Sequence, residues 1–393
     1  MSSATVMFNA VSARPSSTAN VAPAGNGPTR AVPRRGMKCL NAVPQKVNAG
    51  EEKSKIVNSL EQNLALANLS EADLTPEMKY AMKRNKTIQD HFPGSLSVDD
   101  FLFRVEMALS AFGFDGENSI ALVNLCRDEA TNVFRNKIEE IYPLMFNITG
   151  LGGGVTCGVT GLKAGLSHAP ESPSGKKRYI FFACPHIGID SNGGIGNIAR
   201  PGQSKISCAC GAMAGALGQF KADGLEAFVE KPGVHTPLDP EFSILKQSLA
   251  RRIMQESKKV DELDLVELTK IGDRTITAEL ERLVQKAVNP EEADYAIITG
   301  VQIHNTGMEF DNDEPNLEFI APNTVSVIIN GERVDLDLSY LPAASPRQVG
   351  VLGGMALSNS PQSMVANTGN ATVSSIGGPG RTALPNSGIA PRG

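Results

Sequence analysis

The sequence predicts an α/β fold with a central sheet flanked by helices. Residues 119–125 form a short apolar run and residues 177–189 are mostly apolar, and both segments are typical of buried strands. The first run leads directly into a segment with helical spacing, and a helix start follows the second after a short turn and loop. Alternation of buried strands with helices favours such a sheet. Functional residues in these sheets gather beyond the carboxyl ends of the strands.

Helices are predicted on both sides of the first strand. Residues 55–67 have apolar side chains at helical spacing, and Ser97 is placed to cap a second helix. Apolar residues also repeat at helical spacing in that second helix and in the helix after the strand: Phe101, Val105, Leu109 and Phe112, then Phe134, Ile138 and Ile141. Each helix therefore has a face that can cover the sheet.

The second half of the chain continues the alternation. Residues 147–169 are rich in Gly and Thr, with a short helix over residues 161–169. Asn192-Gly193 predicts a hairpin that turns the second strand back into residues 195–200. The remaining predicted elements are a helix that starts at Cys210, helices over 240–257 and 276–287, and strands over 295–304 and 323–329.

Both ends of the chain differ in composition from its centre. Residues 1–50 contain six basic residues and no Asp or Glu, which is typical of an organelle transit peptide. Residues 342–393 are rich in Gly, Pro, Ser, Asn and Ala with almost no charge, so we expect a disordered low-complexity tail. The folded domain is therefore predicted to span residues 51–341.

Composition narrows the range of partners. Without residues 1–50 the chain has 31 basic and 42 acidic residues, a poor basis for binding nucleic acid. No apolar run approaches the length of a membrane span. The six cysteines do not form a disulfide framework in a chain of this length. We therefore expect free thiols, which become metal-ligand candidates where histidines are near.

Three soft side chains lie where the predicted sheet places functional residues. Cys126 follows the first strand, His186 lies near the end of the second, and Cys210 starts a helix. Two thiolates and one imidazole leave a fourth tetrahedral position open, as in catalytic zinc sites. Two alternatives are a Cys208–Cys210 redox pair and buried free cysteines. His168, in a Gly-rich loop, is the rival histidine ligand.

Charged residues next to Cys126 suggest roles beside a metal. Asp128 can orient a water molecule, and Arg127 can hold that acid ionised or bind an anionic product. The alternative is that both belong to an ordinary helix N-terminus. The other histidines, His91, His235 and His304, have no companion ligands in sequence, so we expect them at the surface or in packing roles.

Four segments in order resemble a known family. Residues 124–131, 152–170, 181–190 and 200–212 resemble the limiting-CO2-inducible protein B and C family of green algae, which is related to the theta carbonic anhydrases of diatoms. The likeness covers about residues 51–341. It implies a β-carbonic-anhydrase-like fold, and it makes residues 1–50 a chloroplast transit peptide.

The resemblance also implies roles for the candidate residues. Cys126 and Asp128 match the first half of the β-type pattern, but Ala130 occupies its arginine position, so Arg127 or Arg200 would have to replace that arginine. The second half of the pattern is matched by two residues, His186 and Cys210. With Zn2+ on Cys126, His186 and Cys210, the implied reaction interconverts CO2 and bicarbonate, with Asp128 orienting the water and Arg127 supporting the acid.

The resemblance further implies a cellular setting. The protein is expected in the chloroplast stroma, around the pyrenoid, as part of the algal CO2-concentrating mechanism. We expect a homo-oligomer built on a dimer, or a hetero-oligomer with a family paralogue. Two other functions remain open: a catalytically inactive zinc-binding subunit of a pyrenoid-associated complex, and an α/β scaffold without a metal.

Overall fold

The structure, a computed structural model, describes residues 76–172, 174–229, 237–306 and 316–343. The expected transit peptide over residues 1–50, the helix over 55–67 and the tail beyond residue 343 lie outside the described residues. The helices are α2 (Pro76–His91), α3 (Val98–Ala111), α4 (Asn132–Ile141), α5 (Gly158–Leu166), α6 (Gly211–Asp223), α7 (Glu226–Val229), α8 (Pro240–Gln255) and α9 (Leu265–Ala287). The strands are β1 (Leu96–Ser97), β2 (Ile120–Leu125), β3 (Met145–Asn147), β4 (Lys177–Cys184), β5 (His186–Gly188), β6 (Asn197–Ile198), β7 (Ser207–Cys208), β8 (Ala293–Asn305), β9 (Leu317–Ile329) and β10 (Glu332–Asp335).

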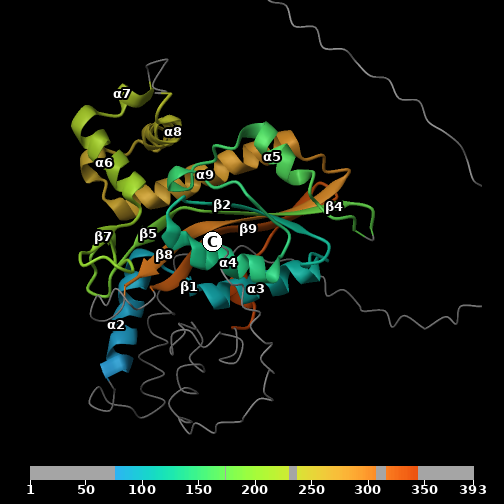
Figure 1. The fold of residues 1–393 in the computed structure, drawn as a ribbon, viewed down its shortest axis with the longest axis horizontal. Coiled ribbons are helices and arrows are strands. Elements are labelled where there is room, and N and C mark those ends of the chain that lie inside the picture. The colour runs from blue at the N-terminus through green and yellow to red at the C-terminus, as the bar shows by residue number, and fades with distance from the viewer. Residues whose placement is uncertain (1–75, 173, 230–236, 307–315, 344–393) are drawn as a thin grey trace, which may run out of the picture. The chain divides into compact units, whose positions relative to one another are not determined.

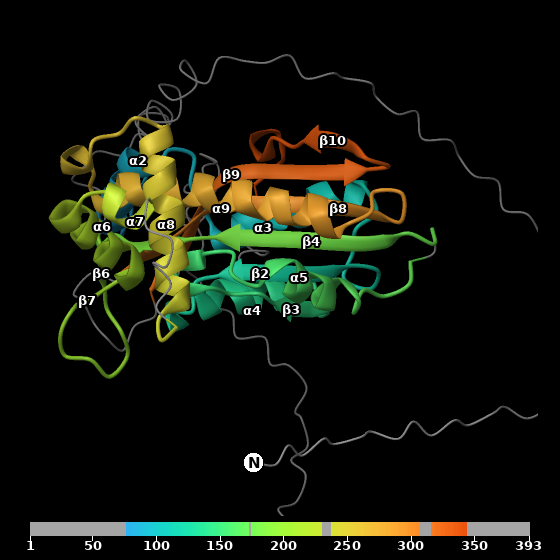
Figure 2. The same cartoon turned by 90° about the horizontal axis from the view of Figure 1, so that it is seen from above.

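A mixed sheet forms the centre of this part of the chain. Its strands follow the order β1-β9-β8-β4-β2-β3, while β10 pairs with β9 and β5 pairs with β8. The pairs β3–β2, β2–β4 and β4–β8 are parallel, whereas β9 is antiparallel to β8 (Figure 2). The carboxyl ends of β2, β4 and β8 therefore lie at one edge. The predicted α/β fold with a helix-flanked sheet is confirmed.

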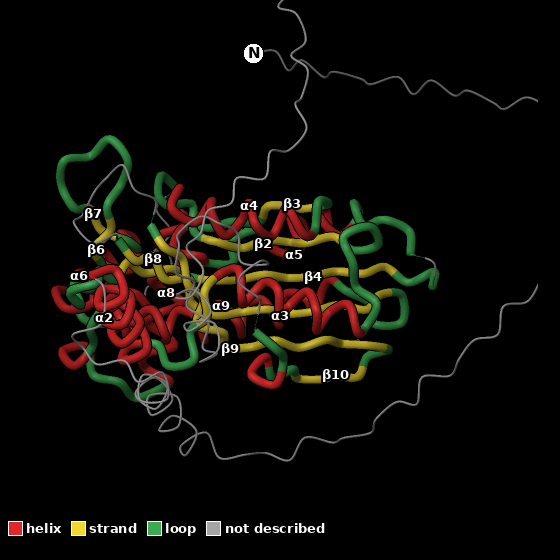
Figure 3. The backbone as a smooth tube through the Cα atoms, turned by 90° about the horizontal axis from the view of Figure 1, so that it is seen from below, coloured by secondary structure: helices red, strands yellow, loops and turns green. Residues whose placement is uncertain are grey.

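Helices cover both faces of the sheet, with α5 and α9 on one face and α3 and α4 on the other (Figure 1; Figure 3). All six residues of β2 are buried. On the α3 side, Phe101 and Phe134 pack in one core with Phe182 of β4. On the α9 side, Ile276 and Leu280 pack over the same strands. Each such side chain contributes about 1.5–3 kcal/mol by burial, so both faces stabilise the parallel strands.

Several predicted boundaries are confirmed by the structure. Ser97 caps α3 through an Oγ that accepts a hydrogen bond from the Asp100 N–H at 3.2 Å. The strand predicted over 119–125 and the helices at Cys210 and over 240–257 are present as β2, α6 and α8. The short helix predicted over 161–169 forms as α5, a few residues earlier.

Other segments differ from the prediction. The strand predicted over 177–189 breaks at Pro185 into β4 and β5, because proline has no N–H for the ladder. The predicted hairpin turn forms, with Asp190 N–H donating to Gly194 O and Ile189 bridging Ile195, and Asn197–Ile198 then pairs with Ser207–Cys208. Helix α9 begins at Leu265, eleven residues before the predicted start. No helix in the described ranges is long and apolar enough to cross a membrane.

Candidate metal centre

Cys126 lies immediately beyond β2, between the ends of two parallel neighbours. Its thiol is buried, and the Gly152 N–H donates to Cys126 Sγ at 3.3 Å. Gly152 has a φ of 64°, and a Cβ there would meet Leu245 at 2.6 Å. The glycine-rich loop therefore brings a backbone donor to the sulfur, which a bulkier residue would hinder.

Cys210 is the N-cap residue of α6 and is almost fully buried. Its Sγ lies 3.8 Å from Cys126 Sγ, close enough for the two thiols to share a proton. This hydrogen bond lowers the pKa of Cys126 to about 4, against the effect of burial, with a further contribution from His186. The same bond and burial raise the pKa of Cys210, which the Met213 and Ala212 N–H groups at the helix start only partly offset. Cys126 is therefore the more acidic of the two thiols.

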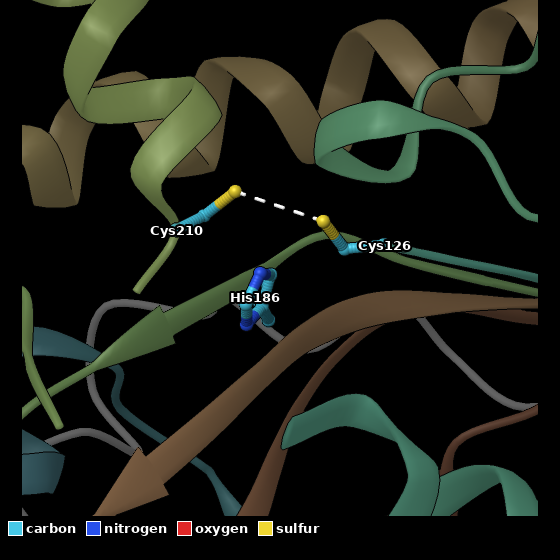
Figure 4. A group of neighbouring side chains, drawn as sticks. All are labelled: Cys126, His186 and Cys210. Atoms are coloured by element: carbon cyan, nitrogen blue, oxygen red, sulfur yellow. Dashed lines mark hydrogen bonds between the residues drawn. The ribbon is translucent and has the colours of Figure 1, made fainter. Parts of the chain in front are cut away.

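His186 completes the cluster from β5. Potential ligand atoms of Cys126, His186 and Cys210 all lie within 4.8 Å of one another (Figure 4). His186 Nδ1 lies 2.7 Å from His304 Nε2, whereas His186 Nε2 is buried and has no hydrogen-bond partner among the described residues. A buried ring nitrogen without a partner is expected where a metal takes its lone pair.

The spacing of the two sulfurs also fits a metal. Tetrahedral zinc with Zn–S bonds of about 2.3 Å separates two sulfur ligands by about 3.8 Å. The observed separation between Cys126 Sγ and Cys210 Sγ is 3.8 Å. The donor set, two thiols and one imidazole, is one that zinc prefers over magnesium or calcium. These residues therefore fit a zinc ion with one coordination position left over.

Asp128 lies beside the cluster and is held by Arg200. Arg200 Nη1 and Nη2 donate to the two carboxylate oxygens at 2.8 and 2.7 Å, and the far side of the guanidinium donates from Nε to Ser207 at 2.8 Å. Asp128 Oδ2 lies 3.8 Å from His186 Nε2. Burial would raise the pKa of Asp128, but the hydrogen bonds from Arg200 hold it well below its usual range. The acid next to the cluster is therefore ionised.

Arg127 does not support Asp128, contrary to the sequence-based expectation. Its guanidinium pairs with Glu241 of α8, with Nε to Oε2 at 2.7 Å and Nη2 to Oε1 at 2.5 Å. Glu241 also accepts from the Leu151 N–H at 3.1 Å. Asp128 has an extended backbone conformation beyond β2, and successive side chains of an extended chain point to opposite sides. Arg200, the other candidate, supplies the arginine at the acid.

The rival ligand His168 lies away from the cluster. Its side chain is exposed and packs edge-on against Phe146, with ring centroids 5.3 Å apart. Geometry therefore places His186, and not His168, beside the two cysteines. His91 is at the end of α2, and His235 lies outside the described residues.

His304 was missed by the sequence analysis, which placed it at the surface or in packing. It is fully buried on β8, where it lies between His186 and Glu318. The available signal was the alternation near the end of β8, where the polar Gln302 and His304 alternate with the apolar Val301 and Ile303. Polar side chains on the buried side of a strand have a specific partner more often than not.

A cavity of about 220 Å³ opens next to the cluster. It lies beyond the ends of β2 and β3 and at the start of α4, and polar side chains form most of its wall. Its lining residues are Cys126, Arg127, Asp128, Thr131, Asn132, Arg135, Asn147 and Thr149. Small polar molecules can therefore approach Cys126 and Asp128 from solvent.

A sheet with a Cys–His–Cys cluster at the carboxyl ends of its parallel strands defines the chain as an α/β protein with a candidate metal centre. Residues 95–329, more than half of the chain, match the family model of the limiting CO2-inducible proteins B/C beta carbonic anhydrases. The chain belongs to this family. Among curated protein sequences, none gives a significant match.

Solved structures agree with this assignment. The crystal structure of limiting CO2-inducible protein LCIB is 50% identical over 63% of this chain and 96% of that chain, with a TM-score of 0.54. The crystal structure of PtLCIB4, a homolog of LCIB, is 21% identical over 64% of this chain and 98% of that one, with a TM-score of 0.53. The second likeness shows the fold alone.

Proposed function

We propose that this protein is a zinc-dependent carbonic anhydrase that interconverts CO2 and bicarbonate. The observation that carries the proposal is the Cys126–His186–Cys210 cluster with an ionised Asp128 beside it. Family membership supports the same chemistry. The two cysteines as thiolates would balance the charge of a divalent cation, and His186 would add a neutral ligand.

Zinc held by these residues would lower the pKa of a water molecule towards neutrality and so supply a nucleophile for CO2. The chain would supply orientation. An ionised Asp128 only accepts hydrogen bonds, so it fixes the direction of a donor next to the cluster. Arg200 holds both carboxylate oxygens, which removes the rotational freedom that Asp128 would otherwise have.

The cavity supports the release of an anionic product. Arg127 and Arg135 are the cationic members of its wall. Arg127 is already paired with Glu241, so its contribution is reduced. Arg135, which forms no ion pair among the described residues, can still attract a bicarbonate ion more than neutral CO2. The cavity is therefore a suitable exit from Asp128 to solvent.

The proposal is tested by stopped-flow CO2 hydration on the purified full chain. Hydration should be present with one zinc per chain, be lost after chelation and return when zinc is restored. The Cys157→Ala variant is the control, because Cys157 lies outside the cluster and should leave both quantities unchanged. Stoichiometric zinc without hydration would favour the second function, a catalytically inactive zinc-binding subunit of a pyrenoid-associated complex. Absence of zinc would contradict both.

We also propose that the protein acts in the chloroplast stroma around the pyrenoid, as a homo-oligomer built on a dimer or with a family paralogue. The acid-free composition of residues 1–50 supports import into an organelle. A fluorescent fusion of the full chain should enter the chloroplast, and one lacking residues 1–50 should not. Light scattering of the purified protein should give at least twice the mass of one chain.

A further inference from the structure

We propose that His304 and Glu318 are positioning residues that fix the tautomer of His186. They leave its Nε2 unprotonated and able to bind a metal. The proposal rests on the zinc site proposed above. It concerns the metal-free protein as well, because the hydrogen bonds lie wholly within the chain. Three strands contribute to the arrangement: β5 with His186, β8 with His304 and β9 with Glu318.

The strand register brings these side chains into line. His304 lies opposite Glu318 in the β8–β9 pair and opposite Gly188 in the β5–β8 pair, two residues beyond His186. His186 Nδ1 is 2.7 Å from His304 Nε2, and His304 Nδ1 is 2.8 Å from Glu318 Oε1. Both histidines are fully buried and Glu318 is 9% exposed. Water therefore has little access to these bonds.

The chemistry of the three groups determines which ring nitrogen of each histidine carries the proton. A carboxylate only accepts, so Glu318 requires the proton of His304 on Nδ1. His304 Nε2 is then a bare acceptor, and it requires the proton of His186 on Nδ1. A neutral imidazole has one N–H, so His186 Nε2 has a free lone pair. This is the atom that has no partner among the described residues.

The opposite pair of tautomers would prevent His186 Nε2 from binding a metal. If Glu318 were protonated and donated to His304, then His304 would donate to His186 and the proton of His186 would lie on Nε2. That N–H would point towards the cysteine sulfurs in place of a lone pair. Gln302 stabilises the first pair of tautomers, because its Nε2 donates to Glu318 Oε2 at 3.0 Å. A second donor favours the ionised carboxylate.

Packing alone does not explain this group. Two close neighbours in these strands, Ile303 of β8 and Ile320 of β9, are apolar and fully buried. Apolar residues at His304 and Glu318 would extend that core, whereas a buried carboxylate costs free energy unless it is bonded. Orienting His186 would explain why polar residues are found at these two positions. Partners of metal-ligating histidines typically change metal affinity by about 10–100-fold when they are removed.

The first test measures zinc affinity of the full chain by competition with a chromophoric chelator. His304→Leu removes the acceptor of His186 and should weaken zinc binding about 10–100-fold. Glu318→Gln keeps an acceptor oxygen of the same shape and should weaken it less. Thr299→Val is the matched control, because it removes a buried β8 hydrogen bond to Thr277 (2.9 Å) that is outside this chain of contacts. It should lower the melting temperature and leave zinc affinity unchanged.

The second test needs no variant and no CO2. The sequence has five histidines, so 15N-histidine NMR of the wild-type full chain can resolve their tautomers. His186 and His304 should both carry their proton on Nδ1, with and without zinc. A proton on His304 Nε2, or zinc affinity of His304→Leu within about threefold of wild type, would overturn the proposal. Loss of CO2 hydration alone would contradict the proposed function and not this tautomer assignment.

Discussion

Two arginine–carboxylate pairs flank Cys126, and they differ in enclosure. The Arg200–Asp128 pair is almost buried, with side chains 12% and 14% exposed, and lies beside the cluster. The Arg127–Glu241 pair has a half-exposed arginine and joins the end of β2 to α8. Arg127 is the sequence neighbour of Asp128, yet the arginine that holds the acid is 72 residues further on. Sequence adjacency is therefore a poor guide to pairing at the end of a strand.

The difference in solvent exposure suits the two ion pairs to different roles. An enclosed pair holds its carboxylate in one orientation, because neither partner can exchange freely with water. An exposed pair is screened and contributes little free energy. Arg200–Asp128 is thus suited to orienting a reacting group, and Arg127–Glu241 to holding α8 against the loop at Leu151. The following predictions test this division.

The largest effect is expected from the cysteine between the two pairs. Cys126→Ala should abolish stoichiometric zinc, because it removes one of three ligands. Cys157→Ala should retain it, because this thiol is outside the cluster. Metal content by mass spectrometry of dialysed protein measures both. Full zinc in Cys126→Ala would show that the metal is bound elsewhere.

One buried carboxylate, Asp273, forms no ion pair with an arginine among the described residues. Asp273 of α9 is 5% exposed, and burial raises its pKa to about 7, although a hydrogen bond with Asn323 opposes the shift. The unfolded state loses this proton near pH 4, so stability falls as pH rises from about 4 to about 7. Asp273→Asn should therefore raise the free energy of unfolding at pH 8 by about 4 kcal/mol and change it little at pH 4. Urea unfolding at both pH values measures this; an equal change at both would contradict it.

Matched amide variants compare the two acids. Asp128→Asn should retain zinc and lower CO2 hydration about 10–100-fold, because the oriented acceptor charge is lost. Glu241→Gln should leave hydration within about threefold, because Glu241 is outside the cluster. Stopped-flow rates at equal zinc content separate the two variants. If Asp128→Asn has undiminished activity, Asp128 is an ordinary helix cap, for which Asn and Asp are nearly equivalent.

The smallest expected effects are changes in the free energy of unfolding when each of the two arginines is replaced. Arg200→Leu leaves Asp128 without its two charged hydrogen bonds and should cost about 2 kcal/mol of unfolding free energy. Arg127→Leu should cost less than about 1 kcal/mol, as is usual for exposed pairs. Urea midpoints at pH 7 provide the measurement. Equal losses would remove the distinction between an enclosed and an exposed pair.

Much of the fold could be predicted because periodicity and capping are local. The buried run of β2 and the Ser97 cap of α3 are examples. The boundaries of helices and strands were predicted wrongly where tertiary contacts override the local hydrophobic pattern. The first half of α9 includes Thr269, Asp273 and Thr275 on its buried side, which hides its amphipathic spacing. Pro322 hides the first half of β9, where a register shift after Thr299 accommodates it.

The candidate site also contains residues that the local sequence indicated and residues that it did not. The positions of Cys126, His186 and Cys210 follow from strand ends and a helix start, so the sequence indicated all three. Arg200 and His304 depend on contacts between distant segments, in a loop and across strands. No local spacing distinguishes Arg200 from other loop arginines. Only the alternation in β8 gave a signal for His304.

Zinc-edge X-ray absorption of the purified full chain tests the central claim most directly, namely that Cys126, His186 and Cys210 hold zinc. The account predicts one zinc per chain with two sulfur ligands at about 2.3 Å and nitrogen or oxygen ligands at about 2.0 Å. Cys210→Ala, if it retains metal, should lose one sulfur from the spectrum. A wild-type protein with no zinc, or with zinc surrounded only by nitrogen and oxygen, would contradict the account.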